Sequence, residues 1–404
     1  MEEAPSAPST LLVAAALALG AAVSLGLARF SYALLLPPMR SDLGWSYLTA
    51  GAMNTVNAAG YLLGALAVPR LLARVDARRV LLGGSAAAAL FLALHGGVTS
   101  DAALFVLRLS TGIASAASFV AGGLLAARLA SGPELGNRAA EQRSRPAGLV
   151  LGIYYGGTGL GIIVSALLVE PLAARSVLHA WQAAWIALGA VALLATLAMR
   201  APTRPLAVSP TAAAASRRFR WAPFAPGLAG YFLFGVGYIG YMTFVITLLR
   251  EQRMDAATIT GFYVVLGVGV IASSWLWAAL LQGTRGGGAF ALLNALLAVA
   301  TALPVISPHP LAVFASGALF GSVFLSVVAS TTALVRHNLP PAAWAGGIGA
   351  FTIVFAAGQI VGPSLVGWVA DGAGGLVRGF IVSAAVLAAG SLIAWRQKAL
   401  VVGA

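Results

Sequence analysis

Two arginines inside long apolar runs are the residues of this 404-residue chain best suited to chemistry in a membrane. Arg29 lies in the phrase Gly26-Leu-Ala-Arg29-Phe-Ser-Tyr32, eight residues before Pro37, and Arg108 lies in a later apolar run. A charge at the centre of a span costs about 2.5–3.5 kcal/mol on insertion scales, so it normally faces protein, water or a ligand. The guanidinium fork matches a carboxylate. The arginines therefore predict an anion site, with Arg29 as the first candidate. The alternative is a structural role, in which each guanidinium binds carbonyls or hydroxyls of neighbouring helices.

Further polar side chains fall at helical spacing in the same apolar runs. Arg29 and Tyr32 are three residues apart and share a helix face. For the asparagines and serines the alternative is packing and hydrogen bonding between helices. The predicted substrate-binding set is Arg29, Tyr32, Asn57, Tyr61, Arg108, Tyr238, Tyr241 and Ser326.

The elements that position these residues are membrane-spanning helices. The chain is 60% hydrophobic and only 9% charged, and it contains no cysteine, so we expect an integral membrane protein without disulfides. Its net charge of +13 comes from basic residues scattered in short connections, which argues against nucleic acid as a partner. The apolar runs of spanning length predict twelve helices. They cover roughly residues 11–36, 46–69, 80–99, 102–127, 147–169, 180–199, 224–249, 259–281, 287–306, 311–335, 342–370 and 376–395.

Basic residues predict the orientation of these helices. With both termini inside, the inner connections hold 17 of the 24 Lys and Arg residues, whereas the outer connections hold five and Arg29 and Arg108 lie within helices. The expected domains are a cytoplasmic tail (1–10), a six-helix bundle (11–200), a cytoplasmic loop (201–223), a second six-helix bundle (224–395) and a cytoplasmic tail (396–404).

An internal repeat indicates that the two bundles are related. The phrase from Gly26 to Tyr32 aligns with Gly235 to Tyr241, which puts Tyr238 at the place of Arg29. The fifth and eleventh helices carry small residues at matching spacing, and such residues let helices approach closely. The predicted packing and gating residues are Gly152, Gly156, Gly157, Gly161, Gly358, Gly362, Pro363 and Gly367.

At this point the chain resembles the major facilitator superfamily over essentially its whole length. Leu107-Arg108-Leu-Ser-Thr-Gly112 resembles the Arg-x-x-x-Gly signature of that family, and the glycine ladders resemble its Gly-x-x-x-Gly-Pro pattern. The loop after the second helix departs from the family pattern, because only Arg78-Arg79 fit and the earlier glycine, aspartate and second glycine are replaced by Arg70, Arg74 and Ala77. The phrase around Arg29, followed by Asn57-Ala-Ala-Gly60-Tyr61-Leu-Leu-Gly64, is more narrowly similar to the bacterial branch labelled YbfB/YjiJ.

This resemblance implies an all-α polytopic membrane protein with two pseudo-symmetric six-helix bundles and a cavity between them. Helices one, four, seven and ten would line the cavity, which opens alternately to each side. The resemblance also implies a multi-pass protein of the bacterial inner membrane.

The expected function is secondary transport of a small organic anion, because none of the eleven acidic residues lies well inside a predicted span to pair with the arginines. The alternative within carriers is export of drug-like or sugar-like compounds, favoured by the aromatic seventh helix. A channel or scaffold is a further alternative. The sequence contains no nucleophile elbow, zinc motif or paired intramembrane aspartates, so we expect no enzyme, cofactor or metal. The expected partners are a small-molecule substrate, a coupling ion in some form and the lipid bilayer, with the chain acting as a monomer.

Overall fold

A computed structural model describes residues 9–131, 147–173, 177–206 and 219–400. Within these residues every regular element is a helix, and twelve helical spans are long and apolar enough to cross a membrane, which confirms the predicted fold class. The helices are α1 (Thr10–Ala21), η1 (Ala22–Phe30), α2 (Tyr32–Leu43), α3 (Tyr47–Leu72), α4 (Ala77–His95), α5 (Asp101–Ser131), α6 (Ala147–Ala173), α7 (Ala180–Arg200), η4 (Arg204–Leu206), η5 (Ala222–Phe224), α8 (Ala225–Glu251), α9 (Ala256–Leu276), α10 (Ala278–Gly283), α11 (Gly288–Ile306), α12 (Pro310–Asn338), α13 (Pro341–Ala370) and α14 (Gly375–Trp395).

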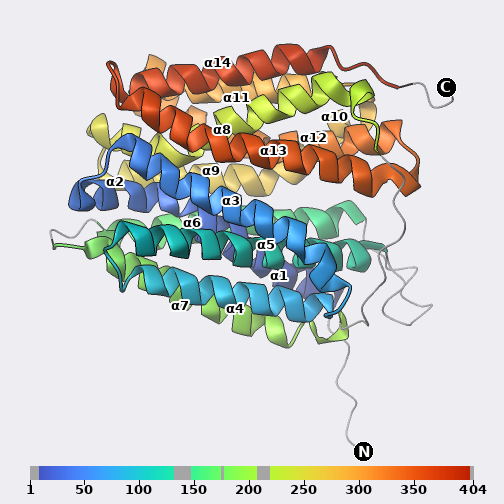
Figure 1. The fold of residues 1–404 in the computed structure, drawn as a ribbon, viewed down its shortest axis with the longest axis horizontal. Coiled ribbons are helices and arrows are strands. Elements are labelled where there is room, and N and C mark those ends of the chain that lie inside the picture. Colours follow the sequence, from blue (N-terminus) through green and yellow to red (C-terminus); the bar gives the residue numbers. More distant parts are fainter. Residues whose placement is uncertain (1–8, 132–146, 174–176, 207–218, 401–404) are drawn as a thin grey trace, which may run out of the picture.

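The helices form two groups that lie side by side (Figure 1). In the N-terminal bundle α5 packs against α3 and α4, α4 against α7, and α1 against α6. In the C-terminal bundle α8 packs against α13 and α14, α9 against α12, and α11 against α12 and α14. The bundles meet mainly where α3 contacts α13 and where α6 contacts α9, while α2 reaches α8. A residue on α2, α3 or α8 can therefore face the other bundle.

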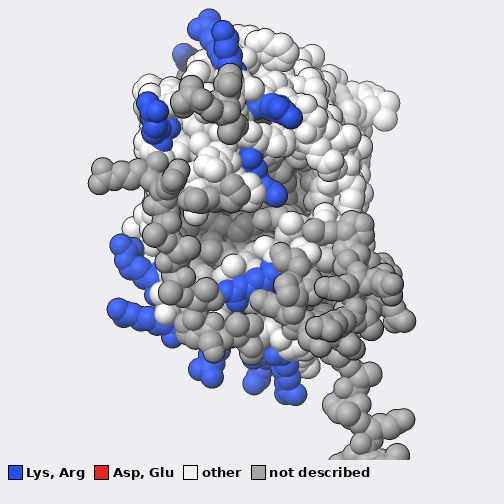
Figure 2. Space-filling view, turned by 90° about the vertical axis from the view of Figure 1, so that its right-hand side faces the viewer, with Lys and Arg blue, Asp and Glu red and all other residues white. Residues whose placement is uncertain are grey.

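The turns of the chain gather at two opposite ends of the molecule. The start of α1 and the end of α14 lie at the end that we call the terminal face, which also carries the turns at 73–76, 284–287 and 339–340 (Figure 1). Lys and Arg side chains are spread around this face (Figure 2). The opposite face carries the turns at 44–46, 96–100, 252–255, 307–309 and 371–374.

The first span is longer than the sequence predicts. Its expected end at residue 36 is wrong, because Pro37 and Pro38 lie inside α2 and the helix continues to Leu43. It ends at Gly44, which has a φ of +66° and so takes the left-handed conformation that commonly stops helices. The run predicted at 259–281 is likewise divided, into α9 and α10, at Trp277.

A π-helical segment, η1, interrupts this first span and contains Arg29. Its wider turn shows in the bond from the Ser31 amide to the Gly26 carbonyl, five residues earlier, at 3.0 Å. Such segments are rare and frequently occur at functional sites. Side chains of α5 and α9 hold the segment by donating to its carbonyls: Ser115 to Ser24, Arg108 to Ala28 and Tyr263 to Phe30. The backbone around Arg29 is thus fixed from both bundles.

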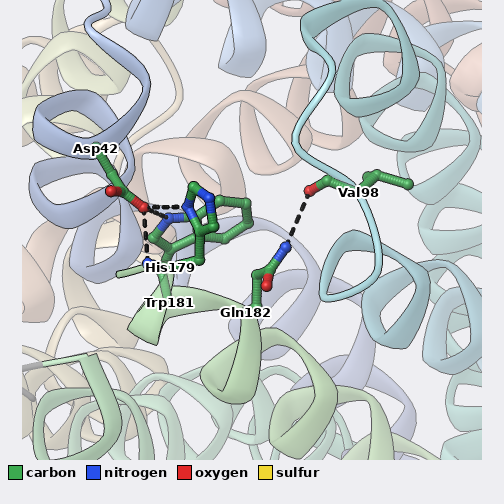
Figure 3. A network of polar contacts seen from close by, with 5 residues as sticks. All are labelled: Asp42, Val98, His179, Trp181 and Gln182. Carbon is green, nitrogen blue, oxygen red and sulfur yellow. Dashed lines mark hydrogen bonds and ion pairs between the residues drawn. The ribbon is translucent and has the colours of Figure 1, made fainter. Parts of the chain in front are cut away.

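A polar cluster ties the end of α2 to the start of α7 at the opposite face (Figure 3). One carboxylate oxygen of Asp42 accepts hydrogen bonds from the His179 amide at 3.0 Å and from the Trp181 indole at 2.7 Å, and it also contacts the His179 ring. Beside it, the Gln182 amide donates to the Val98 carbonyl at 3.5 Å. The end of the first span is therefore also anchored within its own bundle.

Candidate substrate site

Arg29 is a buried cation whose hydrogen-bonding edge is unused. Its side chain is 3% exposed, and neither Nε nor Nη2 has a hydrogen-bond partner among the described residues. These two nitrogens form the side-on edge of the guanidinium, from which two parallel N–H groups can bind both oxygens of one carboxylate. The Tyr61 ring lies 5.5 Å from Cζ, within the range of a cation–π contact. Tyr61 thus stabilises the charge while the edge stays free.

Tyr238 brings a hydroxyl from the other bundle into this neighbourhood. It is 2% exposed and lies within electrostatic range of Arg29. The side-chain amide of Gln359 on α13 donates a hydrogen bond to the Tyr238 hydroxyl. Because the phenol oxygen accepts this bond, its own hydrogen remains available to an anion. Arg29 and Tyr238 occupy matching positions of the repeat, so the site is asymmetric.

Aromatic rings surround Tyr238 on the C-terminal side. Its ring is nearly parallel to those of Phe234, Phe355 and Phe324, with centroids 4.7, 5.6 and 6.0 Å away. Phe30, the neighbour of Arg29, meets Phe324 edge-on at 5.7 Å. We call these five side chains, Phe30, Phe234, Tyr238, Phe324 and Phe355, the aromatic wall. The wall connects the backbone next to Arg29 with the C-terminal bundle.

Arg108 differs from Arg29 because it is engaged by protein groups. It is 1% exposed, and it donates to the Ala28 carbonyl at 3.2 Å and to the Asn54 amide oxygen at 3.3 Å. The Tyr32 ring lies 4.6 Å from its Cζ, and the Asn57 amide donates to the Arg108 carbonyl at 3.0 Å. These contacts favour the structural alternative for Arg108, Tyr32 and Asn57, which join η1, α2, α3 and α5.

Two further predicted residues lie in the interior of the C-terminal bundle. The Tyr241 hydroxyl is hydrogen-bonded to Ser316 at 2.7 Å, and its ring stacks on Phe320 at 4.0 Å. Ser326 donates to the Ser273 carbonyl at 3.1 Å, which joins α12 to α9. The structure therefore brings together Arg29, Tyr61 and Tyr238 of the predicted set, and it engages the other five in contacts between helices.

Sequence reasoning missed Gln359, the phenylalanines of the wall and Tyr155. Tyr155 on α6 is 40% exposed, yet its ring lies 6.0 Å from Phe119 and within electrostatic range of Tyr61. The preference for amides and serines at helix interfaces could not single out Gln359, because its partner lies on a helix over a hundred residues away. A tyrosine directly beside the glycine ladder was the one available signal for Tyr155.

The glycine ladders bring helix backbones together in both bundles, but not in the predicted register. A Cβ on Gly157 would lie 2.7 Å from the Ala18 carbonyl carbon, and one on Gly161 would lie 2.8 Å from Cα of Gly26. In the other bundle Gly358 faces Gly235, the repeat partner of Gly26, and Gly362 faces Ile239. Equivalent contacts thus pair Gly161 with Gly358, whereas the sequence alignment paired Gly152 with Gly358. The difference arises because glycine-rich helices match one another at several offsets.

The remaining ladder residues face the other bundle. Gly152 lies against Trp275 of α9, with 3.3 Å to the nearest indole atoms from an added Cβ, whereas one on Gly156 would meet nothing nearer than Ile271 at 3.8 Å. Gly367 lies against Tyr47, and the Pro363 carbonyl lies against Gly51. These contacts line the two seams between the bundles.

The opposite face is closed by polar contacts between bundles. The Asp371 carboxylate, after the end of α13, accepts the amides of Tyr47 and Leu48 at 2.7 and 2.9 Å and so caps α3. The Tyr47 hydroxyl bonds to Glu251, and Arg250 forms an ion pair with Glu170. Glu170 lies near the end of α6, as the sequence predicts for the acidic residues, but it is 3% exposed. Arg29 is therefore shielded from this face.

Comparison with known families identifies this architecture. The model of a family described as "Uncharacterised MFS-type transporter YbfB" matches residues 21–395. The chain belongs to the YbfB family of major facilitator superfamily transporters. It is therefore a multi-pass membrane transporter of small molecules and not an enzyme. No curated protein matches the chain.

Solved structures share the fold of this YbfB-family chain at low sequence identity. The nucleoside transporter NupG is 17% identical with a TM-score of 0.69, covering 97% of this chain and 100% of its own. A bacterial homologue of the human lysosomal transporter Spinster is 14% identical with a TM-score of 0.68, covering 96% and 95%. The human organic anion transporter MFSD10 (TETRAN) is 15% identical with a TM-score of 0.61, covering 96% and 99%. The TM-scores establish the fold. At these sequence identities the substrate must be inferred from the site.

Proposed function

We propose that the carried solute is a small organic anion and that Arg29 is the residue that holds it. The observation that supports this most directly is the pair of buried, unpartnered nitrogens Nε and Nη2. A buried donor without a partner is unfavourable, and more so when it carries charge. A carboxylate that enters the site would satisfy both nitrogens and neutralise the charge in one step.

Tyr238 adds a second donor from the other bundle, because Gln359 occupies the acceptor side of its hydroxyl. An anion held by Arg29 and Tyr238 together would bind both bundles at once and so bridge them. The structural likeness to an organic anion transporter is consistent with this class of substrate but shows only the fold.

We further propose that the terminal face lies in the cytoplasm of a bacterial inner membrane and that the site opens toward it. The excess of basic residues in the connections on the side of the termini supports the orientation. The contacts that close the opposite face support the direction of opening.

Export of drug-like or sugar-like compounds is the second candidate. The aromatic wall and the likeness to a nucleoside transporter favour it, because rings and hydroxyls bind such solutes without charge. A neutral solute, however, would leave the Arg29 edge without a counter-charge.

Counterflow into proteoliposomes distinguishes these candidates from each other and from a channel or scaffold. Vesicles preloaded with benzoate should accumulate labelled benzoate, vesicles with Arg29→Gln should not, and preloaded benzamide should be without effect. Benzamide that drives equal counterflow would overturn the anion assignment. A lack of saturable exchange with every carboxylate and amide would argue against a carrier of either class.

A further inference from the structure

We propose that the anion carries an aromatic ring, so that the substrates of this site are small aromatic carboxylates. The inference rests on the proposed function and goes one step beyond it, from the charge of the solute to the chemistry of its body. It depends on what surrounds Arg29 rather than on Arg29 itself.

Aromatic side chains lie near Arg29 in both bundles. Tyr61 already covers the guanidinium at 5.5 Å, and Tyr61 lies within electrostatic range of both Tyr155 and Tyr238. The side chain that follows Arg29 in the chain is Phe30, which starts the aromatic wall through Phe324. A solute whose carboxylate meets the edge can therefore place the rest of its body against these rings.

The rings of the aromatic wall are nearly parallel, an arrangement that suits a planar aromatic substrate. Its rings Phe234, Phe355, Tyr238 and Phe324 are within 20° of parallel in each measured pair, with angles of 19°, 8°, 12° and 20°. Offset-parallel and edge-on contacts are the preferred arrangements of aromatic pairs. A substrate ring can extend the array in either way, whereas a saturated ring of the same size cannot.

The Tyr238 ring is held in place by more than packing. Gln359 binds its hydroxyl, and Phe234 and Phe355 lie against its ring. Because these contacts fix the ring before a substrate arrives, little side-chain entropy is lost on binding. The site thus offers a preformed donor and a preformed ring on one residue.

Two acids that differ only in ring type test this inference directly. Benzoate and cyclohexanecarboxylate have the same charge and nearly the same size, and benzamide serves as the uncharged control. Binding of each to the purified protein is measured by calorimetry. An aromatic contact in the array predicts that benzoate binds about 2- to 10-fold more tightly than cyclohexanecarboxylate.

Variants of the aromatic wall test whether it causes the preference for benzoate over cyclohexanecarboxylate. Phe324→Leu should remove the benzoate preference while cyclohexanecarboxylate keeps its affinity. Tyr238→Leu should also remove the preference, but with weaker binding of both acids because the hydroxyl donor is lost as well, and Tyr238→Phe should retain the preference. Phe351→Leu is the matched control, because the Phe351 ring lies edge-on to Phe224 and tilted against Tyr231, outside the wall. Thermal unfolding of each variant shows that it is folded, and either of the two leucine variants suffices if the other fails to fold.

The outcomes distinguish a failure of the aromatic inference from a failure of the anion site. Equal affinity for the two acids, or a preference that survives both leucine variants, overturns the aromatic inference and leaves the anion site standing. Benzamide that binds as tightly as benzoate overturns the anion site and the inference together. The absence of binding by both acids also overturns both.

Discussion

Arg250 of the C-terminal bundle forms an ion pair with Glu170 of the N-terminal bundle at the opposite face. The Glu170 side chain is 3% exposed and that of Arg250 is 35% exposed. The pair joins α8, which carries Tyr238, to α6, which carries Tyr155. Any motion that separates the bundles at this face must break the pair, together with the Asp371 cap on α3 and the bond from Tyr47 to Glu251.

We predict that Glu170→Gln shifts the protein toward a state that is open at the opposite face. Removing one partner of a buried pair leaves the other charge unpaired; the partial exposure of Arg250 reduces the loss to about 1–3 kcal/mol. Because the chain lacks cysteine, Phe244→Cys, at a fully buried site 6.2 Å from the Tyr47 ring, can report opening by maleimide labelling. Labelling should accelerate roughly tenfold.

The matched control is Asp255→Asn at the same face. Asp255 caps α9 within its own bundle by accepting the Thr258 amide at 2.7 Å, and the same bond lowers the pKa of its carboxyl. Its loss should leave Phe244→Cys labelling unchanged. If Asp255→Asn and Glu170→Gln accelerate labelling equally, the ion pair has no special part in closing this face.

Adjacent glycines on α6 give the next prediction. Gly157→Ala should destabilise the protein by about 1–3 kcal/mol and slow transport, because the new methyl group runs into the Ala18 backbone. Gly156→Ala should be neutral or slightly stabilising, since its nearest neighbour is 3.8 Å away and alanine favours helix. Thermal unfolding and counterflow measure both effects. The two variants behaving alike would mean that the ladder does not set the distance between α1 and α6.

Sequence patterns predict the helices more readily than the contacts of the site, and individual residues show the physical reasons. Spans follow from hydropathy alone, so the sequence predicts all twelve helices. It places a helix end at Pro37 and Pro38, where the structure has none, because a helix usually stops near proline. The π-segment leaves no mark in composition. Arg29 and Arg108 look alike in sequence, and only the positions of Asn54 and the Ala28 carbonyl separate them. Such partners depend on packing between distant helices, which periodicity does not encode.

Single cysteines test the proposed orientation. In right-side-out vesicles, Thr99→Cys should react with an impermeant maleimide and Ser209→Cys should not, because the basic connections are expected in the cytoplasm. Ser209 lies outside the described residues, so its side is inferred from charge alone. Permeabilised vesicles, in which both sites should react, provide the control. Reaction of Ser209→Cys in intact vesicles would reverse the assignment.

Substitution of each buried arginine by glutamine should have different effects on stability. Arg108→Gln should destabilise the protein by roughly 1–3 kcal/mol, because it removes the hydrogen bonds to the Ala28 carbonyl and to Asn54 and leaves their oxygens unpaired. Arg29→Gln removes a buried charge whose Nε and Nη2 have no partner among the described residues. Its thermal unfolding temperature should therefore stay the same or rise, while benzoate binding is lost.

Arg29→Lys separates charge from geometry at this site. A lysine keeps the positive charge but offers a single point donor in place of two parallel N–H groups, so benzoate should bind measurably but about 10-fold or more weakly. Tyr238→Phe should cost less, because it removes one neutral donor and keeps the ring. Calorimetry with benzoate and thermal unfolding of the parent and the variants Arg29→Gln, Arg29→Lys, Tyr238→Phe and Arg108→Gln decide the matter. Should Arg29→Gln bind benzoate like the parent and unfold at a lower temperature, Arg29 would be a structural residue like Arg108, and the anion would have to be sought elsewhere between the bundles.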